Sequence, residues 1–244
     1  MSVGFKAAAR KTGVAIKSVS GKLRFPVQSA VIDCVIADHL TYLDRGALFD
    51  LIELVQRADS YKLPGIVIET GCALGGSAIA ITSAKSPARV FRVYDTFGLI
   101  PPPSSKDGKD VADRYQEIIS GKSKGIAGET YYGYRSDLLS SVDRAFRRHG
   151  YPVEENSVQL IQGLFEETLT GDDPVALAHI DCDWYESVMT CLIRIAPRLA
   201  PGGTLVLDDY QHWSGCRRAV DDFFRTRRSD FVFKTRDRLH ITKR

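Results

Sequence analysis

The stretch "GIVIETGCALGGSAIAITSAK" (residues 65–85) contains the parts of one strand-turn-helix unit. "GIVIET" (65–70) is a β-branched apolar run after a Pro-Gly break, which predicts a short buried strand. "GCALGGS" (71–77) is rich in glycine, which permits unusual φ angles and close approach of the backbone. "AIAITSAK" (78–85) has helical character. The stretch therefore predicts a strand that leads through a tight turn into a helix.

The same order of elements repeats along the chain. Further strands are predicted at residues 89–95, 157–163, 175–181 and 202–209. Residues 186–203 predict a helix that Pro201-Gly202 ends, residues 214–228 another helix, and residues 231–243 a β-hairpin. Alternating strands and helices favour an α/β fold with a mostly parallel sheet covered by helices on both faces. With the hairpin, we expect seven strands.

The composition is that of an ordinary soluble globular protein. The 244 residues are 44% hydrophobic and 26% charged, and the formal net charge of +3 is too small to indicate nucleic acid as a partner. No apolar stretch approaches the length of a membrane span. The five cysteines form no C-x-x-C pair and no zinc spacing, which fits a reducing, cytoplasmic location.

Two segments depart from the repeated pattern. The first 25 residues contain lysine and arginine but no acid, and we expect residues 1–45 to form a basic, helical N-terminal arm beside a domain of residues 46–244. Residues 97–135 are rich in Pro, Ser, Gly and Tyr, and long irregular insertions in compact domains are often lids or binding loops. The position of this insertion, just after a predicted strand, favours a lid.

Acidic residues follow the predicted strands. Glu69, Asp95, Asp181 and Asp208 all lie at predicted strand ends, and ligands of open α/β sheets bind outside the carboxyl ends of the strands. Glu69 suits an amine or hydroxyl better than a phosphate. Asp95 is suitably placed to accept hydrogen bonds from both ribose hydroxyls of a nucleoside.

These features resemble the class I S-adenosylmethionine methyltransferases, which have a Rossmann-like fold. Three stretches narrow the likeness to the macrocin O-methyltransferase family: "YDTFGLIPPP" (94–103), "GLFEETL" (163–169) and a long block from "HIDCDWYES" (179–187) through "LDDYQHW" (207–213) to Phe223. The resemblance covers roughly residues 60–225. The chain departs from the family pattern at Leu164, where Trp is usual, and in "PPPSSKDGKD" (101–110).

The resemblance implies transfer of a methyl group from S-adenosylmethionine to a hydroxyl of a sugar, in a glycoside or oligosaccharide, with help from Mg²⁺. By this resemblance the metal ligands are Asp181, Asp208 and Asp209, and Asp183 is the general base, with His212 a rival. The residues expected to bind the cofactor are Glu69, Thr70, Gly71, Gly75, Ser77, Asp95, Thr96, Gly163, Phe165 and Asp181. A homodimer is also expected.

The acids suit this chemistry. A sugar hydroxyl is a poor nucleophile at neutral pH, and a divalent cation lowers its pKa and orients it. Mg²⁺ prefers hard oxygen ligands, and no His or Cys spacing here indicates a softer metal. Asp208, Asp209 and Asp183 have an alternative interpretation as helix caps. Trp184, Tyr185, Tyr131, Tyr132 and Tyr134 are possible contacts to the acceptor.

Three other functions stay open from the sequence. A metal-dependent catechol-type O-methyltransferase would use the same fold, with two vicinal phenol oxygens on the cation. A nucleotide-binding oxidoreductase would need a pyrophosphate-binding turn, which residues 69–72 do not resemble. A non-catalytic binding module would not explain the concentration of acids.

Overall fold

A computed structural model describes residues 21 and 23–244 of the chain, so residues 1–20 and 22 of the predicted N-terminal arm lie outside the described residues. Among the described residues the strands form one seven-stranded sheet in the order β3-β2-β1-β4-β5-β7-β6. The strands are β1 (Ile66–Thr70), β2 (Phe91–Asp95), β3 (Val158–Gln162), β4 (Val175–Ile180), β5 (Leu199–Leu207), β6 (Phe231–Thr235) and β7 (Leu239–Lys243). Strands β1 to β5 are parallel, and β7 is antiparallel to β5 and β6. The predicted α/β fold with a C-terminal antiparallel hairpin is confirmed.

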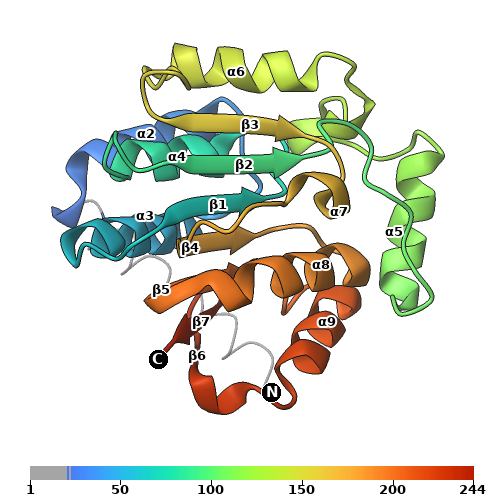
Figure 1. The fold of residues 1–244 in the computed structure, drawn as a ribbon. Helices are drawn as coiled ribbons and strands as arrows, with labels where there is room; N and C mark the ends of the chain where they lie inside the picture. Colours follow the sequence, from blue (N-terminus) through green and yellow to red (C-terminus); the bar gives the residue numbers. More distant parts are fainter. Residues whose placement is uncertain (1–20, 22) are drawn as a thin grey trace, which may run out of the picture.

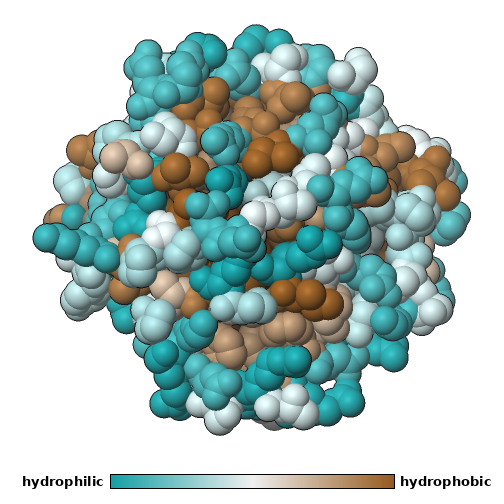
Figure 2. Space-filling model, in the orientation of Figure 1, coloured by the Kyte–Doolittle hydropathy of each residue, from teal (hydrophilic) through white to brown (hydrophobic). Residues whose placement is uncertain are grey.

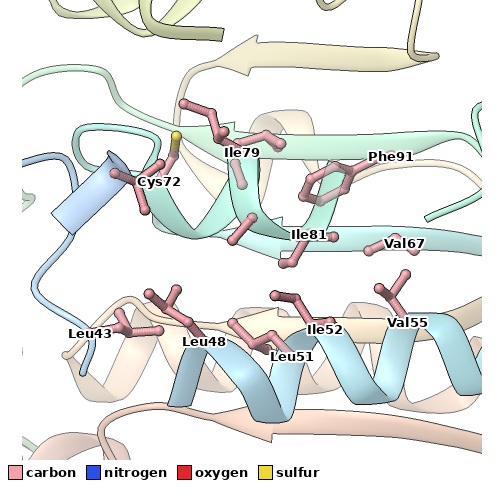
Figure 3. Packing of buried hydrophobic residues seen from close by; sticks show 14 of the residues in the cluster. Leu43, Leu48, Leu51, Ile52, Val55, Val67, Cys72, Ile79, Ile81 and Phe91 are labelled. Carbon is pink, nitrogen blue, oxygen red and sulfur yellow. The ribbon is translucent and has the colours of Figure 1, made fainter. Parts of the chain in front are cut away.

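Helices cover both faces of the sheet (Figure 1). They are α2 (Pro26–Ala37), α3 (Arg45–Ser60), α4 (Gly76–Ala84), α5 (Lys109–Ile119), α6 (Leu138–Arg148), α7 (Phe165–Thr168), α8 (Tyr185–Ile195) and α9 (Ser214–Phe224). Helices α2, α3, α4 and α6 share one apolar core with β1 and β2, while α8, α9 and the hairpin share the other. Figure 3 shows Leu48, Ile52 and Val55 of α3 directed toward Ile81 of α4 and Val67 of β1.

The predicted helix over residues 186–203 is wrong at its end. Helix α8 stops at Ile195, because Pro197 lacks an N–H and its ring disfavours a continued helix. Strand β5 then begins at Leu199, so Pro201 and Gly202 lie inside the strand. The pairing of β4 with β5 shifts register across this part, as expected for an irregularity at Pro-Gly.

The inserted segment 97–135 lies beside the carboxyl ends of the strands (Figure 1). It contains helix α5 and two short 3-10 turns, Ile126–Gly128 and Tyr132–Tyr134, as well as irregular chain.

The face drawn in Figure 2 is mostly hydrophilic, with apolar patches scattered among polar residues. Within the described residues, none of the helices is long and apolar enough to cross a membrane. The carboxyl ends of the strands, beside the inserted segment, are the place where open α/β sheets bind their ligands.

Candidate active site

Two adjoining pockets open at the carboxyl ends of β1, β2 and β4. The larger holds about 900 Å³ and the smaller about 520 Å³, both counting space open to solvent. Both are lined by Gly71, Asp95, Tyr132, Asp181 and Asp183. The pockets therefore meet at the residues that follow the strands, which is the position expected for ligands of this fold.

The glycine-rich turn after β1 is held by Asp95. The Asp95 carboxylate accepts hydrogen bonds from the backbone N–H groups of Cys72 (2.6 Å), Ala73 (3.0 Å) and Phe97 (2.7 Å). Gly71 has a φ of 89°, and a Cβ added there would lie 1.7 Å from the carbonyl oxygen of Asp181. The turn thus packs directly on the residues after β4, and glycine is the residue that permits this approach.

Three carboxylates meet where the two pockets join. Asp181, Asp183 and Asp209 each offer an oxygen atom, and these atoms lie within 4.8 Å of one another. Asp183 has a φ of 57°, in the left-handed region, and its N–H donates to Oδ2 of Asp209 at 3.3 Å. A backbone outlier of this kind is often found at functional sites.

Burial and mutual repulsion oppose ionisation of these acids. Burial, with the charges of neighbouring carboxylates, raises the pKa of Asp181 and Asp209 well above the usual range. Burial also raises the pKa of Asp183 to about 6, although a hydrogen bond with Asp209 and the charge of Arg114 oppose the shift. Three converging hard oxygens fit a divalent metal ion such as Mg²⁺.

Asp208 lies behind this cluster in a different environment. Arg238 donates from Nε to Oδ1 of Asp208 at 2.6 Å, and His179 Nε2 lies 3.6 Å from the same oxygen. Nδ1 of His179 lies 2.8 Å from Oε1 of Glu69. Burial alone would raise the pKa of Asp208, but the hydrogen bonds and charges of His179 and Arg238 lower it below the usual range. Burial works against protonation of His179, yet Asp208 and Glu69 raise its pKa to about 10.

The other predicted site residues are distributed around the two pockets. Ser77 lines the larger pocket, whereas Thr96, Gly163 and Phe165 line the smaller one. Glu69, Thr70 and Gly75 line neither pocket, and Glu69 is fully buried against His179. His212 is exposed, with a ring nitrogen within 4.8 Å of Asp208 and Asp209 oxygens. Leu164, the departure from the family pattern, also lines the smaller pocket.

Aromatic rings form much of the larger pocket. Its aromatic lining consists of Tyr42, Tyr131, Tyr132, Trp184 and Trp213. The rings of Trp184 and Trp213 meet edge to face, with centroids 5.7 Å apart, and Tyr42 meets Tyr132 in the same manner at 6.2 Å. Tyr134 and Tyr185, also considered from the sequence, line neither pocket.

Among the aromatic and charged residues of this pocket, sequence reasoning missed three: Tyr42, Arg114 and Trp213. Tyr42 lies between α2 and α3, Arg114 on α5, and Trp213 at the start of α9. Arg114 lies 5.5 Å from the centre of the Tyr131 ring. The acids were located by their positions directly after parallel strands. Tyr42 and Arg114 lie elsewhere, so that pattern does not indicate them. For Trp213 the only signal in the sequence is its closeness to Asp209.

The sheet order, the glycine-rich turn after β1 and the acid that ends β2 define the fold of a class I methyltransferase. A model of the family described as macrocin O-methyltransferase matches residues 39–235. The chain belongs to this family.

Similar proteins agree with this assignment. The chain is 27% identical over 183 residues, 72% of its length, to demethyldecarbamoylnovobiocin O-methyltransferase of Streptomyces niveus. It is 31% identical over 169 residues, 66% of its length, to the 8-demethyl-8-(2,3-dimethoxy-alpha-L-rhamnosyl)-tetracenomycin-C 4'-O-methyltransferase of Streptomyces olivaceus. These matches span 64% and 58% of the two relatives' own lengths.

A solved structure has the same fold. The O-methyltransferase NovP superposes with a TM-score of 0.70 at 23% identity, covering 84% of this chain and 82% of that chain. At that level of identity the likeness concerns the fold alone.

Proposed function

We propose that the protein transfers a methyl group from S-adenosylmethionine to a hydroxyl group of a sugar, in a glycoside or an oligosaccharide. The observation that carries the proposal is the meeting of two pockets at Asp181 and Asp183. The smaller pocket adjoins the ends of β2 and β3, and the larger pocket is lined by aromatic rings. The family assignment supports methyl transfer, and the names of the relatives support a sugar acceptor.

The smaller pocket would take the nucleoside part of the cofactor. Thr96, Gly163 and Phe165 line it beside Asp95, whose carboxylate would accept hydrogen bonds from ribose hydroxyls. The part that carries the methyl group would lie near Gly71, where the two pockets join, and Ser77 lies beside it in the larger pocket. This arrangement would direct the methyl group toward the acids.

The larger pocket would take the acceptor. Aromatic side chains suit the apolar faces of sugar rings because they offer large rigid contact areas. The oxygen of the sugar hydroxyl would attack the methyl carbon while the bond from that carbon to sulfur breaks. Asp183 would accept the proton that the hydroxyl group loses. The products would be a methyl ether and S-adenosylhomocysteine. Holding the two reactants in line would supply much of the acceleration.

Mg²⁺ would be held by Asp181, Asp208 and Asp209. The grouping of Asp181, Asp183 and Asp209 oxygens supports a cation at this place, and it would leave Asp183 beside the ion. A bound Mg²⁺ supplies a lower hydroxyl pKa and a fixed acceptor orientation. His212, which is exposed, is the alternative base. A homodimer and a cytoplasmic location stay predictions.

The decisive experiment is mass spectrometry after incubation with S-adenosylmethionine, Mg²⁺ and a panel of glycosides, with a catechol beside them. A sugar product heavier by one CH₂ supports the proposal, whereas methylation of the catechol alone would replace it with the catechol-type activity. EDTA and Asp209→Ala should each abolish turnover while leaving binding of S-adenosylhomocysteine, measured by calorimetry, largely intact. Full activity in EDTA would remove the metal from the proposal.

A further inference from the structure

Residues 101–110, which we call the strap, run from the smaller pocket to the beginnings of two helices. At one end Pro101 lines the smaller pocket, and its carbonyl accepts a hydrogen bond of 3.0 Å from Nε1 of Trp184. At the other end the strap contacts α8 and α9, the helices that follow the loops carrying Asp183 and Asp209. The strap therefore connects the smaller pocket to the beginnings of α8 and α9.

Asp107 of the strap caps α8. Helix α8 begins at Tyr185, and its preceding residue, Trp184, provides no side-chain cap. The N–H of Tyr185 instead donates to Oδ1 of Asp107 at 2.8 Å, while Oδ2 of Asp107 accepts from the N–H of Ser104, also at 2.8 Å. Because the first N–H groups of a helix lack partners within it, this acid replaces the missing local cap.

Asp110 caps α9 in the same way. Trp213, which precedes this helix, also provides no side-chain cap. Both the N–H and the hydroxyl of Ser214 donate to the Asp110 carboxylate, the N–H at 2.9 Å, and the N–H of Gly108 donates to the Ser214 hydroxyl at 3.2 Å. Two acids three residues apart on one segment thus cap two different helices.

Gly215 of α9 leaves room for the strap because it has no side chain. A Cβ added at Gly215 would lie 2.0 Å from Oδ1 of Asp107 and 2.9 Å from the N–H nitrogen of Tyr185. Gly215 therefore leaves the space in which the Asp107 carboxylate reaches α8. Any larger residue at this position of α9 would collide with the contact between Asp107 and Tyr185.

We propose that Asp107 and Asp110 are positioning residues for the reaction: by capping α8 and α9 from the strap, they hold the loops that carry Asp183 and Asp209 in their reactive arrangement. This inference rests on the proposed function. Asp183 lies two residues before the N–H that Asp107 holds, and Asp209 lies five residues before the N–H that Asp110 holds. Loss of either cap should therefore move the acids without removing them.

The two tryptophans of the chain give a readout that does not depend on turnover. Trp184 and Trp213 directly precede α8 and α9, and their rings are in edge-to-face contact. The near-ultraviolet circular dichroism and tryptophan fluorescence of the protein therefore report on the two helix beginnings. Asp107→Ala and Asp110→Ala should each change both spectra, and Asp107→Asn should change them less because its Oδ1 still accepts from Tyr185.

Turnover provides the second readout. We expect Asp107→Ala to lower kcat about tenfold or more, since small displacements of reacting groups can cost about a hundredfold. Asp107→Asn should stay within about threefold of the wild type, because Asn caps helices about as well as Asp. Asp33→Ala on α2 is the matched control, because Asp33 is exposed and pairs with Arg45, outside the strap and both helices.

The outcomes separate the strap from the proposed function. If the wild type methylates no acceptor, the proposed function fails, while the spectra still test whether the strap orders the two helix beginnings. If the wild type is active and folded Asp107→Ala matches it in kcat and in both spectra, the positioning role is overturned. Gly215→Ala is judged by the same criteria if Asp107→Ala does not fold, because it keeps the carboxylate but takes its space.

Discussion

Nε of Arg238 donates a 2.6 Å hydrogen bond to Oδ1 of Asp208, and both side chains are buried. Arg238 directly precedes β7, whereas Asp208 directly follows β5, the strand to which β7 pairs in antiparallel fashion. The hairpin therefore delivers a positive charge to the edge of the sheet where the acids gather. Of the clustered acids Asp181, Asp183, Asp208 and Asp209, Asp208 therefore has its charge balanced by a side chain of the protein itself.

Arg238→Met should destabilise the protein by about 3–5 kcal/mol, because it removes the charged donor that hydrogen-bonds the buried Asp208 carboxylate at 2.6 Å. Urea unfolding followed by circular dichroism measures the loss. Adding Asp208→Asn to Arg238→Met should recover part of it, since the unpaired charge is then gone. Arg225→Met is the control, because Arg225 is exposed and should change stability by no more than about 0.5 kcal/mol. Equal losses in the two arginine variants would contradict the assignment.

Gly71→Ala should prevent cofactor binding. The added methyl group would lie 1.7 Å from the Asp181 carbonyl oxygen, so the turn after β1 must move away from β4. Gly150→Ala is a matched control, because Gly150 also has a positive φ (82°) but nothing lies within 4 Å of the added carbon. Calorimetry with S-adenosylhomocysteine should detect binding to the Gly150 variant and none to the Gly71 variant. Similar affinities would show that the close approach has no role in the site.

Asp183→Asn should reduce turnover far more than metal affinity, if Asp183 is the base. Asp209→Asn should weaken metal affinity as well, because Asp209 is a proposed ligand. Titration with Mn²⁺, followed by electron paramagnetic resonance, gives the affinity of each variant, and initial rates give the turnover. His212→Ala provides the comparison with the rival base. An active Asp183→Asn enzyme beside an inactive His212→Ala enzyme would transfer the role to His212.

Tyr42→Ala should raise the KM for the acceptor about two- to twelvefold, the loss of roughly 0.5–1.5 kcal/mol typical of one aromatic contact. Tyr42 lines the larger pocket and contacts Tyr132, so its removal opens the proposed acceptor wall. Affinity for S-adenosylhomocysteine should not change. Tyr61→Ala is the control, because Tyr61 is an exposed tyrosine that lines neither pocket. An unchanged KM in both variants would place the acceptor elsewhere.

Lys85 should make the stability rise between pH 8 and about pH 10.4. Burial lowers the pKa of its ammonium group to about 8 in the folded protein, against about 10.4 in an unfolded chain. Between these values the unfolded state binds more protons than the folded state at this group, so the free energy of unfolding increases with pH. The difference in stability between the wild type and Lys85→Met, measured across this range, isolates the effect. A difference independent of pH would contradict it.

The sheet and the acids could be predicted because both follow from local patterns. Buried apolar runs mark the strands, and parallel strands bring their carboxyl ends to one edge, which predicts Asp95, Asp181 and Asp208 along that edge. Asp95 and Asp181 line both pockets, whereas Asp208 lies behind them against Arg238. Glu69 was placed less well, because β1 continues through Thr70 and Glu69 lies within the strand. Its partner across the sheet is His179, a pairing set by register that the sequence does not display.

Contacts between distant segments could not be predicted. The Arg238–Asp208 pair joins residues 30 positions apart, and the Asp107–Tyr185 contact joins residues 78 positions apart. No local sequence pattern predicts either contact, because each depends on how the hairpin and the strap pack against the rest of the folded chain. The end of α8 is a different case: Pro197 was a visible signal, and the apolar face around it was mistaken for continued helix.

The sheet order also divides the molecule in a useful way. Strands β1 to β3 and the glycine-rich turn come from residues before 163, and β4 to β7 with the clustered acids come from residues after 174. Across the sheet, the two groups of strands meet at the pairing of β1 with β4. Two polypeptides separated between Gly171 and Pro174 would each carry an unbroken set of neighbouring strands. If the mixed polypeptides show the proposed activity, the protein would serve as a split reporter, whose signal depends on the pairing of β1 with β4.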